Sequence, residues 1–341
     1  MQGGGNADSG IEHTLLEHGG KIRAAAQRYG IPENDWLDLS TGINPNSWPV
    51  PAVPQEIWQR LPQDDDELHA AAQSYYGTTA LLAVAGSQAA IQALPRLRAP
   101  CRVAVVTPSY AEHAHSWQQH GHQVTALSAA EILHIGDDVQ VVLIVNPNNP
   151  SGKLFSRDEL LHLHEQLVAR GGWLVVDEAF MDAATEHSIA SLSPREGLIV
   201  LRSVGKFFGL AGARAGFVLA EQKLLNTLAA LLGPWPIAAP SRYVTTLALR
   251  DFTWQQAARH ALDQATQRLA DLLTQHGLAP DGGCALFQWV RRDDAANVHK
   301  QLARHGILTR LFETPSSLRF GLPRDETEWQ RLANTLSELR R

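Results

Sequence analysis

SVGKFFGLAGARAG, residues 203–216, is the stretch of this chain that says most about its architecture and chemistry. It places Lys206 in a glycine-rich segment, with Ser203 three residues before it and Arg214 eight residues after it. A lysine amine attacks a carbonyl only when it is neutral, so a reactive lysine needs a pKa below its usual value of about 10.4. The apolar residues that follow it and the cationic Arg214 can both lower that pKa. The stretch therefore predicts a lysine able to form a Schiff base, and an exposed loop lysine is the alternative.

The bulk composition is that of an ordinary globular protein. The 341 residues are 44% hydrophobic, which is enough for one large domain or two unequal ones. The net charge is −6, with 29 basic and 35 acidic residues. Because no run of Lys and Arg with interleaved aromatic residues occurs, nucleic acid is not an expected partner.

Cysteine usage and the first residues bear on the compartment. The two cysteines, Cys101 and Cys284, make no disulfide framework and fit a reducing compartment. Residues 1–6 have neither a basic nor an apolar export segment, and no apolar run reaches the roughly 18 residues of a membrane helix. We expect a soluble protein of the cytoplasm with no membrane partner.

Two buried parallel strands are predicted at residues 139–145 and 173–176, because both are short apolar runs that end at polar residues. A periodic leucine run with a serine N-cap and a glycine stop predicts a helix over residues 156–170 between them, which makes a β-α-β unit. Further strands are predicted at residues 101–106 and 198–201. Open α/β sheets bind ligands outside the carboxyl ends of their strands, so the polar residues that follow these strands are expected to line one pocket.

The sequence changes character after residues 233–236. A long amphipathic helix over residues 254–276 and short strands around 284–290 and 318–322 predict a smaller α+β domain. The first forty-odd residues, with a helix near residues 21–29, are expected to pack on that same domain. The expected limits are residues 46–235 for the large domain and residues 1–45 with 236–341 for the small domain.

Five motifs occur in an order that is typical of one enzyme superfamily. They are Ala85-Gly86-Ser87-Gln88, Tyr110, Asn146-Pro147-Asn148-Asn149-Pro150, Asp177-Glu178-Ala179-Phe180 and Ser203-x-x-Lys206. Together they resemble the motifs of fold-type-I pyridoxal 5′-phosphate (PLP) enzymes, over nearly the whole chain. The resemblance implies an α/β fold in which helices sandwich a mostly parallel seven-stranded sheet in the large domain, plus a smaller α+β domain. It also implies PLP as the cofactor, bound covalently by Lys206.

The resemblance assigns one set of residues to the cofactor phosphate. The turn at Gly86, Ser87 and Gln88 offers backbone N–H groups if a helix begins there. Ser203 and Arg214 would add a hydroxyl and a guanidinium to the same phosphate. The alternative for Ser203 and Gly86 is that they are ordinary turn residues.

A second set of residues surrounds the pyridine ring. Asp177 would keep the ring nitrogen protonated, Asn149 would donate to the O3′ oxygen, and Tyr110 would lie on the ring face. We therefore expect Lys206, Asp177 and Tyr110 to be the catalytic residues, with no metal ligand in the site. The alternatives are helix capping for Asp177, turn chemistry for Asn149 and core packing for Tyr110.

Segments near both ends of the chain narrow the family further. Residues 18–25 (HGGKIRAA), 39–45 (LSTGINP), 307–310 (ILTR) and 318–321 (LRFG) resemble the threonine-phosphate decarboxylases of cobalamin biosynthesis, close relatives of histidinol-phosphate aminotransferases. The resemblance implies that Arg319 binds the α-carboxylate of the substrate, and that Arg310 and His18 bind its phosphate. It adds Gly42 and Asn149 as substrate-binding positions. The alternatives are a capping or buried histidine for His18 and surface ion pairs for the two arginines.

Three positions depart from the family pattern. Gly42 stands where the decarboxylases have an asparagine that touches substrate, so that contact is lost or replaced. Leu61 stands where relatives often have a tyrosine that reaches the cofactor phosphate of the neighbouring subunit. Phe180 stands where many aminotransferases have a tyrosine that bonds O3′, and this departure favours the decarboxylases.

The resemblance implies a homodimer that decarboxylates L-threonine O-3-phosphate to (R)-1-amino-2-propanol O-2-phosphate. A histidinol-phosphate-type aminotransferase is the main alternative. The two reactions differ in which bond to Cα stands perpendicular to the ring, and sequence motifs do not report that angle. A second alternative is a binding or assembly protein without turnover, which the presence of Lys206, Asp177 and Arg214 disfavours. A metalloenzyme is disfavoured because histidine pairs such as His113/His115 lie two residues apart and point away from each other on a helix.

Overall fold

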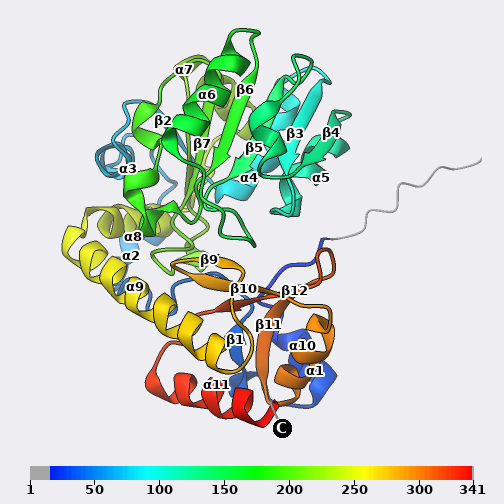
Figure 1. The fold of residues 1–341 in the computed structure, drawn as a ribbon. Helices are drawn as coiled ribbons and strands as arrows, with labels where there is room; N and C mark the ends of the chain where they lie inside the picture. The colour runs from blue at the N-terminus through cyan, green and yellow to red at the C-terminus, as the bar shows by residue number, and fades with distance from the viewer. Residues whose placement is uncertain (1–15, 340–341) are drawn as a thin grey trace, which may run out of the picture.

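The computed structural model describes residues 16–339, so residues 1–15 of the predicted small domain and residues 340–341 lie outside the description. The strands form two separate sheets, one above the other in Figure 1. The larger sheet has seven strands, in the order β2 (Leu81–Val84), β8 (Gly216–Leu219), β7 (Leu198–Ser203), β6 (Trp173–Asp177), β5 (Val141–Val145), β3 (Arg102–Val106) and β4 (Gln123–Leu127). Among these seven strands, β8 alone runs opposite to the other six. The prediction of a mostly parallel seven-stranded sheet is confirmed.

The predicted β-α-β unit is present. β5 and β6 pair in parallel, and α6 (Arg157–Val168) connects them. The helix begins at a capping box, in which the Ser156 hydroxyl accepts from the Glu159 amide and the Glu159 carboxylate accepts from the Ser156 amide. All residues of β5 are buried, which explains why this strand is a continuous apolar run.

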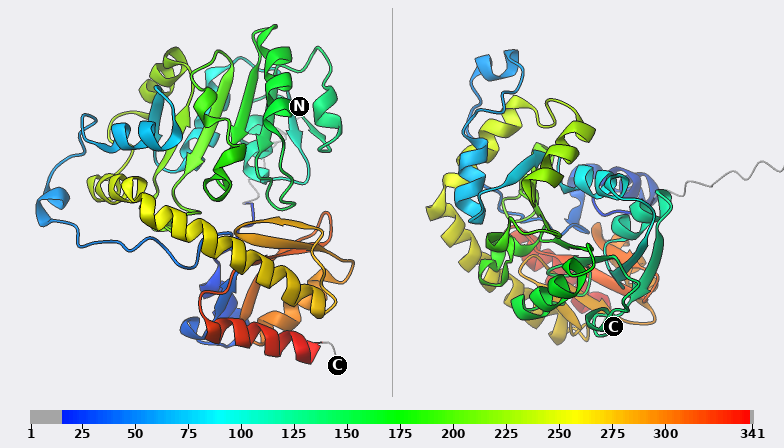
Figure 2. Two further views of the ribbon diagram at one scale, coloured as in Figure 1. Left: turned by 60° about the vertical axis from the view of Figure 1, so that its left-hand side comes forward. Right: turned by 90° about the horizontal axis from the view of Figure 1, so that it is seen from above.

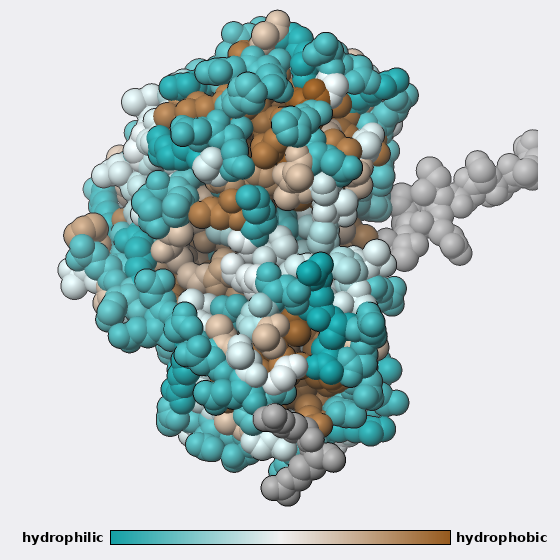
Figure 3. All heavy atoms as spheres, viewed as in Figure 1, coloured by the Kyte–Doolittle hydropathy of each residue, from teal (hydrophilic) through white to brown (hydrophobic). Residues whose placement is uncertain are grey.

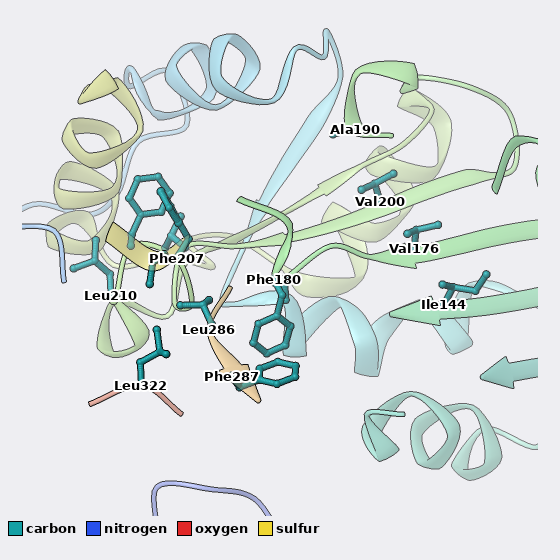
Figure 4. Close-up of a cluster of buried hydrophobic side chains, with 14 of the residues drawn as sticks. Ile144, Val176, Phe180, Ala190, Val200, Phe207, Leu210, Leu286, Phe287 and Leu322 are labelled. Atoms are coloured by element: carbon teal, nitrogen blue, oxygen red, sulfur yellow. The ribbon is translucent and has the colours of Figure 1, made fainter. Parts of the chain in front are cut away.

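Helices cover both faces of the large sheet. Successive residues of a strand point to opposite faces, and buried apolar residues of the sheet's strands occur on both. Ile144, Val176 and Val200 pair across β5, β6 and β7, as Figure 4 shows. They share one core cluster with Leu160, Leu163 and Leu167 of α6. Their neighbours Leu143 and Val175 belong to a second cluster. That cluster packs against α4 (Ser87–Ala93), α5 (Ala111–Gln119) and α7 (Gln222–Leu232). The remaining helices of this part are α3 (Leu68–Tyr76) and α8 (Ala239–Arg250), which pack on each other.

The smaller sheet combines residues from both ends of the chain. Its order is β1 (Leu37–Leu39), β11 (Ile307–Phe312), β12 (Ser317–Gly321), β10 (Phe287–Arg291) and β9 (Gly282–Cys284). β1 pairs in parallel with β11, whereas the other pairs are antiparallel. The accompanying helices are α1 (Ile22–Tyr29), α9 (Phe252–Gln275), α10 (Ala295–Arg304) and α11 (Glu326–Leu339). α9 runs from the side of the large sheet to the small sheet (Figure 1). The predicted limits of the two domains, residues 46–235 and residues 1–45 with 236–341, stay predictions.

Residues 46–63, which we call the arm, extend from the body of the molecule and carry α2 (Gln55–Gln59), as the left view of Figure 2 shows. The arm exposes large apolar side chains: Val50 is 53%, Trp58 66% and Leu61 64% exposed. The face seen in Figure 3 is largely hydrophilic, with hydrophobic residues in patches over the larger sheet. Between residues 16 and 339, no helix combines the length and the apolar character needed to cross a bilayer.

Candidate active site

The carboxyl ends of four neighbouring parallel strands meet at one edge of the large sheet. Side chains assigned from the sequence follow each of them: Tyr110 after β3, Asn149 after β5, Asp177 at the end of β6 and Lys206 after β7. The small sheet meets this edge, because Arg319 of β12 hydrogen-bonds to Asn149. The predicted convergence of strand ends on one site is therefore present in the fold.

Lys206 has the environment that a nucleophilic amine requires. Its pKa is lowered to about 8, first by burial and then by the Arg319 guanidinium. Arg214 lowers this pKa as well, whereas the Asp177 carboxylate opposes the shift. The Lys206 Nζ also lies 5.5 Å from the centre of the Phe180 ring. At pH 7.5 an amine with such a pKa is neutral for about a quarter of the time, which is the form that attacks a carbonyl.

Asp177 is buried, with 3% of its surface exposed, and both of its carboxylate oxygens are engaged. Oδ1 accepts from the Ala179 amide at 3.0 Å, and Oδ2 lies 2.9 Å from Nε2 of the buried His113. Because a carboxylate only accepts, His113 carries its hydrogen on Nε2. Neighbouring Glu178 bonds elsewhere and forms a buried ion pair with Arg202. Of the two acids in the motif, only Asp177 belongs to the site.

Sequence reasoning missed His113, although a signal for it exists. His113 lies in α5, three residues after Tyr110, which is the N-cap of that helix. Residues three apart on a helix share a face, so a residue that follows Tyr110 at this spacing points to the same strand-end edge. The two rings lie 6.1 Å apart and nearly perpendicular, at 81°.

The residues assigned to the cofactor phosphate converge at the start of α4. Gly86 is its N-cap with φ 70°, and a Cβ added there would lie 3.0 Å from the Arg214 Nη2. Glycine therefore allows the guanidinium to approach the backbone at the helix start. Ser87 opens the helix, and the buried Ser203 ends β7, where its Oγ accepts from the Gly205 amide at 3.3 Å. Backbone amides, a hydroxyl and a guanidinium in this arrangement suit a phosphate group.

Asn149 and Arg319 connect the two parts of the molecule. The Arg319 Nη1 donates to the Asn149 Oδ1 at 2.6 Å, and its Nη2 donates to the Ser40 carbonyl at 2.7 Å. Because Oδ1 faces a guanidinium, the Asn149 amide nitrogen remains as a donor, as a contact to O3′ requires. The buried Arg319 Nε has no hydrogen-bond partner within residues 16–339. Burial lowers the pKa of Arg319 to about 10, and a substrate carboxylate would pair both the charge and the free donor.

Gly42 lies where a side chain has no room. A Cβ added there would lie 2.8 Å from the Phe180 ring and 3.0 Å from the Phe287 ring. These two rings pack edge to face with centroids 5.3 Å apart, and Figure 4 shows them side by side. The asparagine of the family pattern therefore does not fit at position 42 beside Phe180 and Phe287, and Gly42 can contribute only its backbone.

The two residues assigned to the substrate phosphate, Arg310 and His18, meet at the N-terminal segment of the chain. The Arg310 Nη2 donates to the Glu17 carbonyl at 2.7 Å, and its Nη1 lies 3.5 Å from the Glu17 carboxylate. Neighbouring His18 places its Nε2 2.8 Å from the Glu112 Oε1. Burial lowers the pKa of Arg310, and Glu17 opposes this shift. Arg310 and His18 thus lie near each other, and both contact acidic residues.

A second residue that sequence reasoning missed is Glu112. Its Oε2 accepts from the Gln88 Nε2 at 2.9 Å, and the Gln88 Oε1 accepts from the Tyr110 hydroxyl at 3.1 Å. Burial raises the pKa of Tyr110, with Glu112 and then Asp177 adding to the shift, so its hydroxyl keeps its proton.

Leu61 lies on the arm and is 64% exposed, so one chain alone does not bring it to the site.

Comparison with known proteins agrees with this arrangement. Residues 51–336 match the model of the family "Aminotransferase class I and II". The chain is 56% identical over 318 residues to a threonine-phosphate decarboxylase of Pseudomonas aeruginosa, covering 93% of this chain and 96% of the relative. It is 41% identical to a threonine-phosphate decarboxylase of Sinorhizobium sp, covering 95% of this chain and 98% of the relative. The predicted resemblance to these decarboxylases is confirmed.

The fold is also that of a solved structure. A histidinol-phosphate aminotransferase from Sinorhizobium meliloti, in complex with pyridoxal 5′-phosphate, superposes with a TM-score of 0.84 at 19% identity. The match covers 97% of this chain and 96% of that one. The predicted fold-type-I architecture is confirmed.

Proposed function

Because the chain belongs to the aminotransferase class I and II family, we propose that it uses PLP to decarboxylate L-threonine O-3-phosphate to (R)-1-amino-2-propanol O-2-phosphate. The observation that carries the choice of reaction is the 56% identity to a threonine-phosphate decarboxylase over nearly the full length of both chains. The place of this step in cobalamin biosynthesis is part of the same proposal.

The residues present fit PLP. Gly86, Ser87, Ser203 and Arg214 would hold its phosphate, Asp177 its ring nitrogen and Asn149 its O3′, while Gln88 holds the Tyr110 hydroxyl beside the site. The group supplies an aldehyde that captures the substrate amine and a cationic ring that takes up the electron pair left when carbon dioxide departs. Asp177, which is buried and held by His113, would supply the carboxylate that keeps the ring nitrogen protonated.

Lys206 would act twice. Its lowered pKa makes the neutral amine accessible near pH 8, so that it can hold the cofactor and be displaced by a substrate amine. Once released, Lys206 can take up a proton from solvent and, as an ammonium, would deliver it to Cα at the position that the carboxylate has left. In the balanced reaction the bond between Cα and the carboxylate breaks, carbon dioxide leaves, and one proton is added to Cα.

Two cationic side chains would fix the substrate at its ends. Arg319 has a buried donor free to meet the α-carboxylate, and Arg310 with His18 would meet the side-chain phosphate. A substrate held at both ends presents a defined bond at Cα to the cofactor plane, which is what selects one reaction over another. Gly42 would offer the substrate only its backbone, because the Phe180 and Phe287 rings leave no space for a side chain there.

One experiment separates the proposed reaction from its main rival. The purified enzyme with PLP is incubated with L-threonine O-3-phosphate alone, and separately with histidinol phosphate and a keto acid acceptor. We expect carbon dioxide from the first mixture and no amino transfer in the second. Amino transfer without carbon dioxide release would instead assign the aminotransferase reaction, and the absence of both would favour a protein that only binds.

The oligomeric state and location complete the proposal. We propose a homodimer of the cytoplasm in which the arm packs on a second copy of the chain. The support is the exposed Trp58 and Leu61 on the arm, together with Trp235, which is 53% exposed, and Phe252, which is 63% exposed. Leu61 also borders a groove of about 290 Å³ that Tyr243 lines from α8. The thiols of Cys101 and Cys284 are free, which fits a reducing compartment.

A further inference from the structure

Glu112 links two parts of the site that the proposed function treats separately. It lies in the first turn of α5, and its side chain is 13% exposed. Its two oxygens have different partners: Oε1 meets His18 of the N-terminal segment, and Oε2 meets Gln88 of α4. Gln88 in turn holds the Tyr110 hydroxyl. A continuous chain of hydrogen bonds thus runs from the substrate-phosphate side to the aromatic ring on the cofactor side.

The charge of Glu112 fixes the direction of every bond in this chain. A carboxylate accepts only, so His18 donates through Nε2 and Gln88 donates through its amide nitrogen. The Gln88 carbonyl oxygen is therefore turned toward Tyr110, whose hydroxyl is the donor. With its Nε2 engaged, His18 has Nδ1 left for a ligand, and this nitrogen can donate to a phosphate when the ring carries both hydrogens. A single carboxylate thus determines the orientation of both the Gln88 amide and the His18 ring.

The position of His18 connects this chain to the phosphate end of the substrate. Its neighbour Glu17 occupies Arg310, through the carbonyl at 2.7 Å and the carboxylate at 3.5 Å. The His18 ring also lies 6.0 Å from the Tyr110 ring. A phosphate that binds Arg310 competes with Glu17 there and brings charge next to His18. Because Glu112 bonds to both His18 and Gln88, a movement of His18 changes the position of the Glu112 carboxylate and, through Gln88, that of the Tyr110 hydroxyl.

We propose that Glu112 is a positioning residue that couples recognition of the substrate phosphate at His18 to the placement of Tyr110 against the cofactor. This inference rests on the proposed function, because it takes Arg310 and His18 as the phosphate-binding pair. It predicts that an amino acid without a phosphate does not benefit from Glu112. Glu112 thereby contributes to substrate specificity without touching the reacting atoms.

The test uses the Glu112→Gln variant of the full chain with PLP bound. An amide of the same shape has one acceptor and one donor end, so both contacts can persist only if His18 changes its tautomer or the Gln88 amide turns over, and the negative charge is lost in either case. We expect the dissociation constant for L-threonine O-3-phosphate, from titration of the cofactor absorption, to rise about tenfold, and that for L-threonine to change less than about twofold. We also expect a changed visible circular dichroism of the bound cofactor, since the amide of Gln88, the partner of Tyr110, is no longer oriented by a carboxylate.

Two comparisons make the test decisive. In a His18→Ala background, Glu112→Gln should weaken phosphate-substrate binding less than about twofold further, because the two residues act as one unit. Glu131→Gln is the matched control, since Glu131 bonds to Ser128 in its own turn. Should the amide variant fail to fold, Glu112→Asp keeps the charge but shortens the reach, and we expect it to show the same loss for the phosphorylated ligand.

Independent, multiplicative effects of the His18 and Glu112 substitutions, or an unchanged circular dichroism, would overturn the coupling. These readouts are separate from turnover. If the unaltered enzyme releases no carbon dioxide but the coupling is present, the proposed reaction fails and the role of Glu112 stands. If carbon dioxide is released and the coupling is absent, only the role of Glu112 fails.

Discussion

The Nε2 of His113 lies 2.9 Å from the Oδ2 of Asp177, and both side chains are buried. The second oxygen of Asp177 is held by the Ala179 amide. The carboxylate is therefore fixed from two sides before any ligand binds. An aspartate that must face a ring nitrogen gains from such fixation, because no binding energy is needed to orient it.

Replacing His113 should lower catalysis while leaving substrate affinity largely intact. We expect His113→Asn to lower kcat about tenfold to a hundredfold, which corresponds to the loss of one hydrogen bond to a charged group. Steady-state kinetics with L-threonine O-3-phosphate measures the effect. His115→Asn on the same helix is the control and should behave as the unaltered enzyme. A larger change in KM than in kcat would contradict the assignment.

Removing the amine of Lys206 should abolish turnover. We expect Lys206→Ala to lose carbon dioxide release and the visible absorption of covalently bound cofactor, as absorption spectra and a carbon dioxide assay would show. Borohydride treatment of the unaltered enzyme followed by peptide mapping should place the cofactor on residue 206. Labelling of a different lysine would remove the basis of the proposed function.

The lowered pKa of Lys206 predicts a pH dependence for capture of the cofactor by the cofactor-free protein. The amine reacts when neutral, so the rate should rise with pH through a midpoint of about 8 and fall off below it. Arg319 lowers this pKa, so Arg319→Gln should move the midpoint to higher pH. Stopped-flow absorption measures both curves. A midpoint near that of a free lysine in the unaltered protein would contradict the effect of burial.

Arg310 is expected to distinguish substrate from cofactor. Arg310→Ala should raise KM for the phosphorylated substrate about tenfold to a hundredfold, because one charge-assisted contact to the phosphate is lost. Its effect on cofactor affinity, measured by equilibrium dialysis, should be less than about twofold. Equal losses of both affinities would mean that Arg310 does not belong to the substrate phosphate.

Position 42 offers a test of packing at the site. Gly42→Ala places a methyl group against Phe180 and Phe287, so we expect a loss of about 1–3 kcal/mol in the free energy of unfolding. Denaturant titration measures this loss. Gly212→Ala is the control, because an added Cβ there meets no atom within 4 Å among residues 16–339. Equal stabilities of the two variants would show that the rings move aside freely.

The exposed arm predicts the behaviour of the assembly. We expect Trp58→Glu to convert a dimer into a monomer, because a charge at an apolar interface core is costly to bury. Sedimentation velocity would measure the mass of both proteins at matched concentration. Glu56→Gln, on the same helix, should leave the assembly unchanged. A monomeric unaltered protein would refute the proposed homodimer.

The large sheet and the strand-end residues could be predicted because each has a local signal. Buried parallel strands such as β5 are continuous apolar runs, and the Ser156–Glu159 capping box marks the start of α6. The positions of Asp177 and Lys206 follow from the strand ends. The local stretch around Lys206 predicts a Schiff-base lysine, with an exposed loop lysine as the alternative, whereas the role of Asp177 at a ring nitrogen is implied by the resemblance to a family.

The parts that could not be predicted depend on contacts between distant segments. His18 and Glu112 are 94 residues apart, and Asn149 and Arg319 are 170 residues apart. No periodicity or capping rule reports such approaches. The crowding of Gly42 likewise depends on the rotamer of Phe180, which local sequence does not determine.

The antiparallel turn from β7 into β8 makes one ribbon of backbone carry both proposed anchors of the cofactor, Lys206 and Arg214. Ser203 pairs with Gly216, so the loop that leaves the sheet with Lys206 returns to the same place with Arg214. The number of residues between the two strands sets the distance between the proposed point of covalent attachment and the proposed phosphate contact. A single inserted or deleted residue in this ribbon would misplace one anchor relative to the other, which makes its length as constrained as its composition.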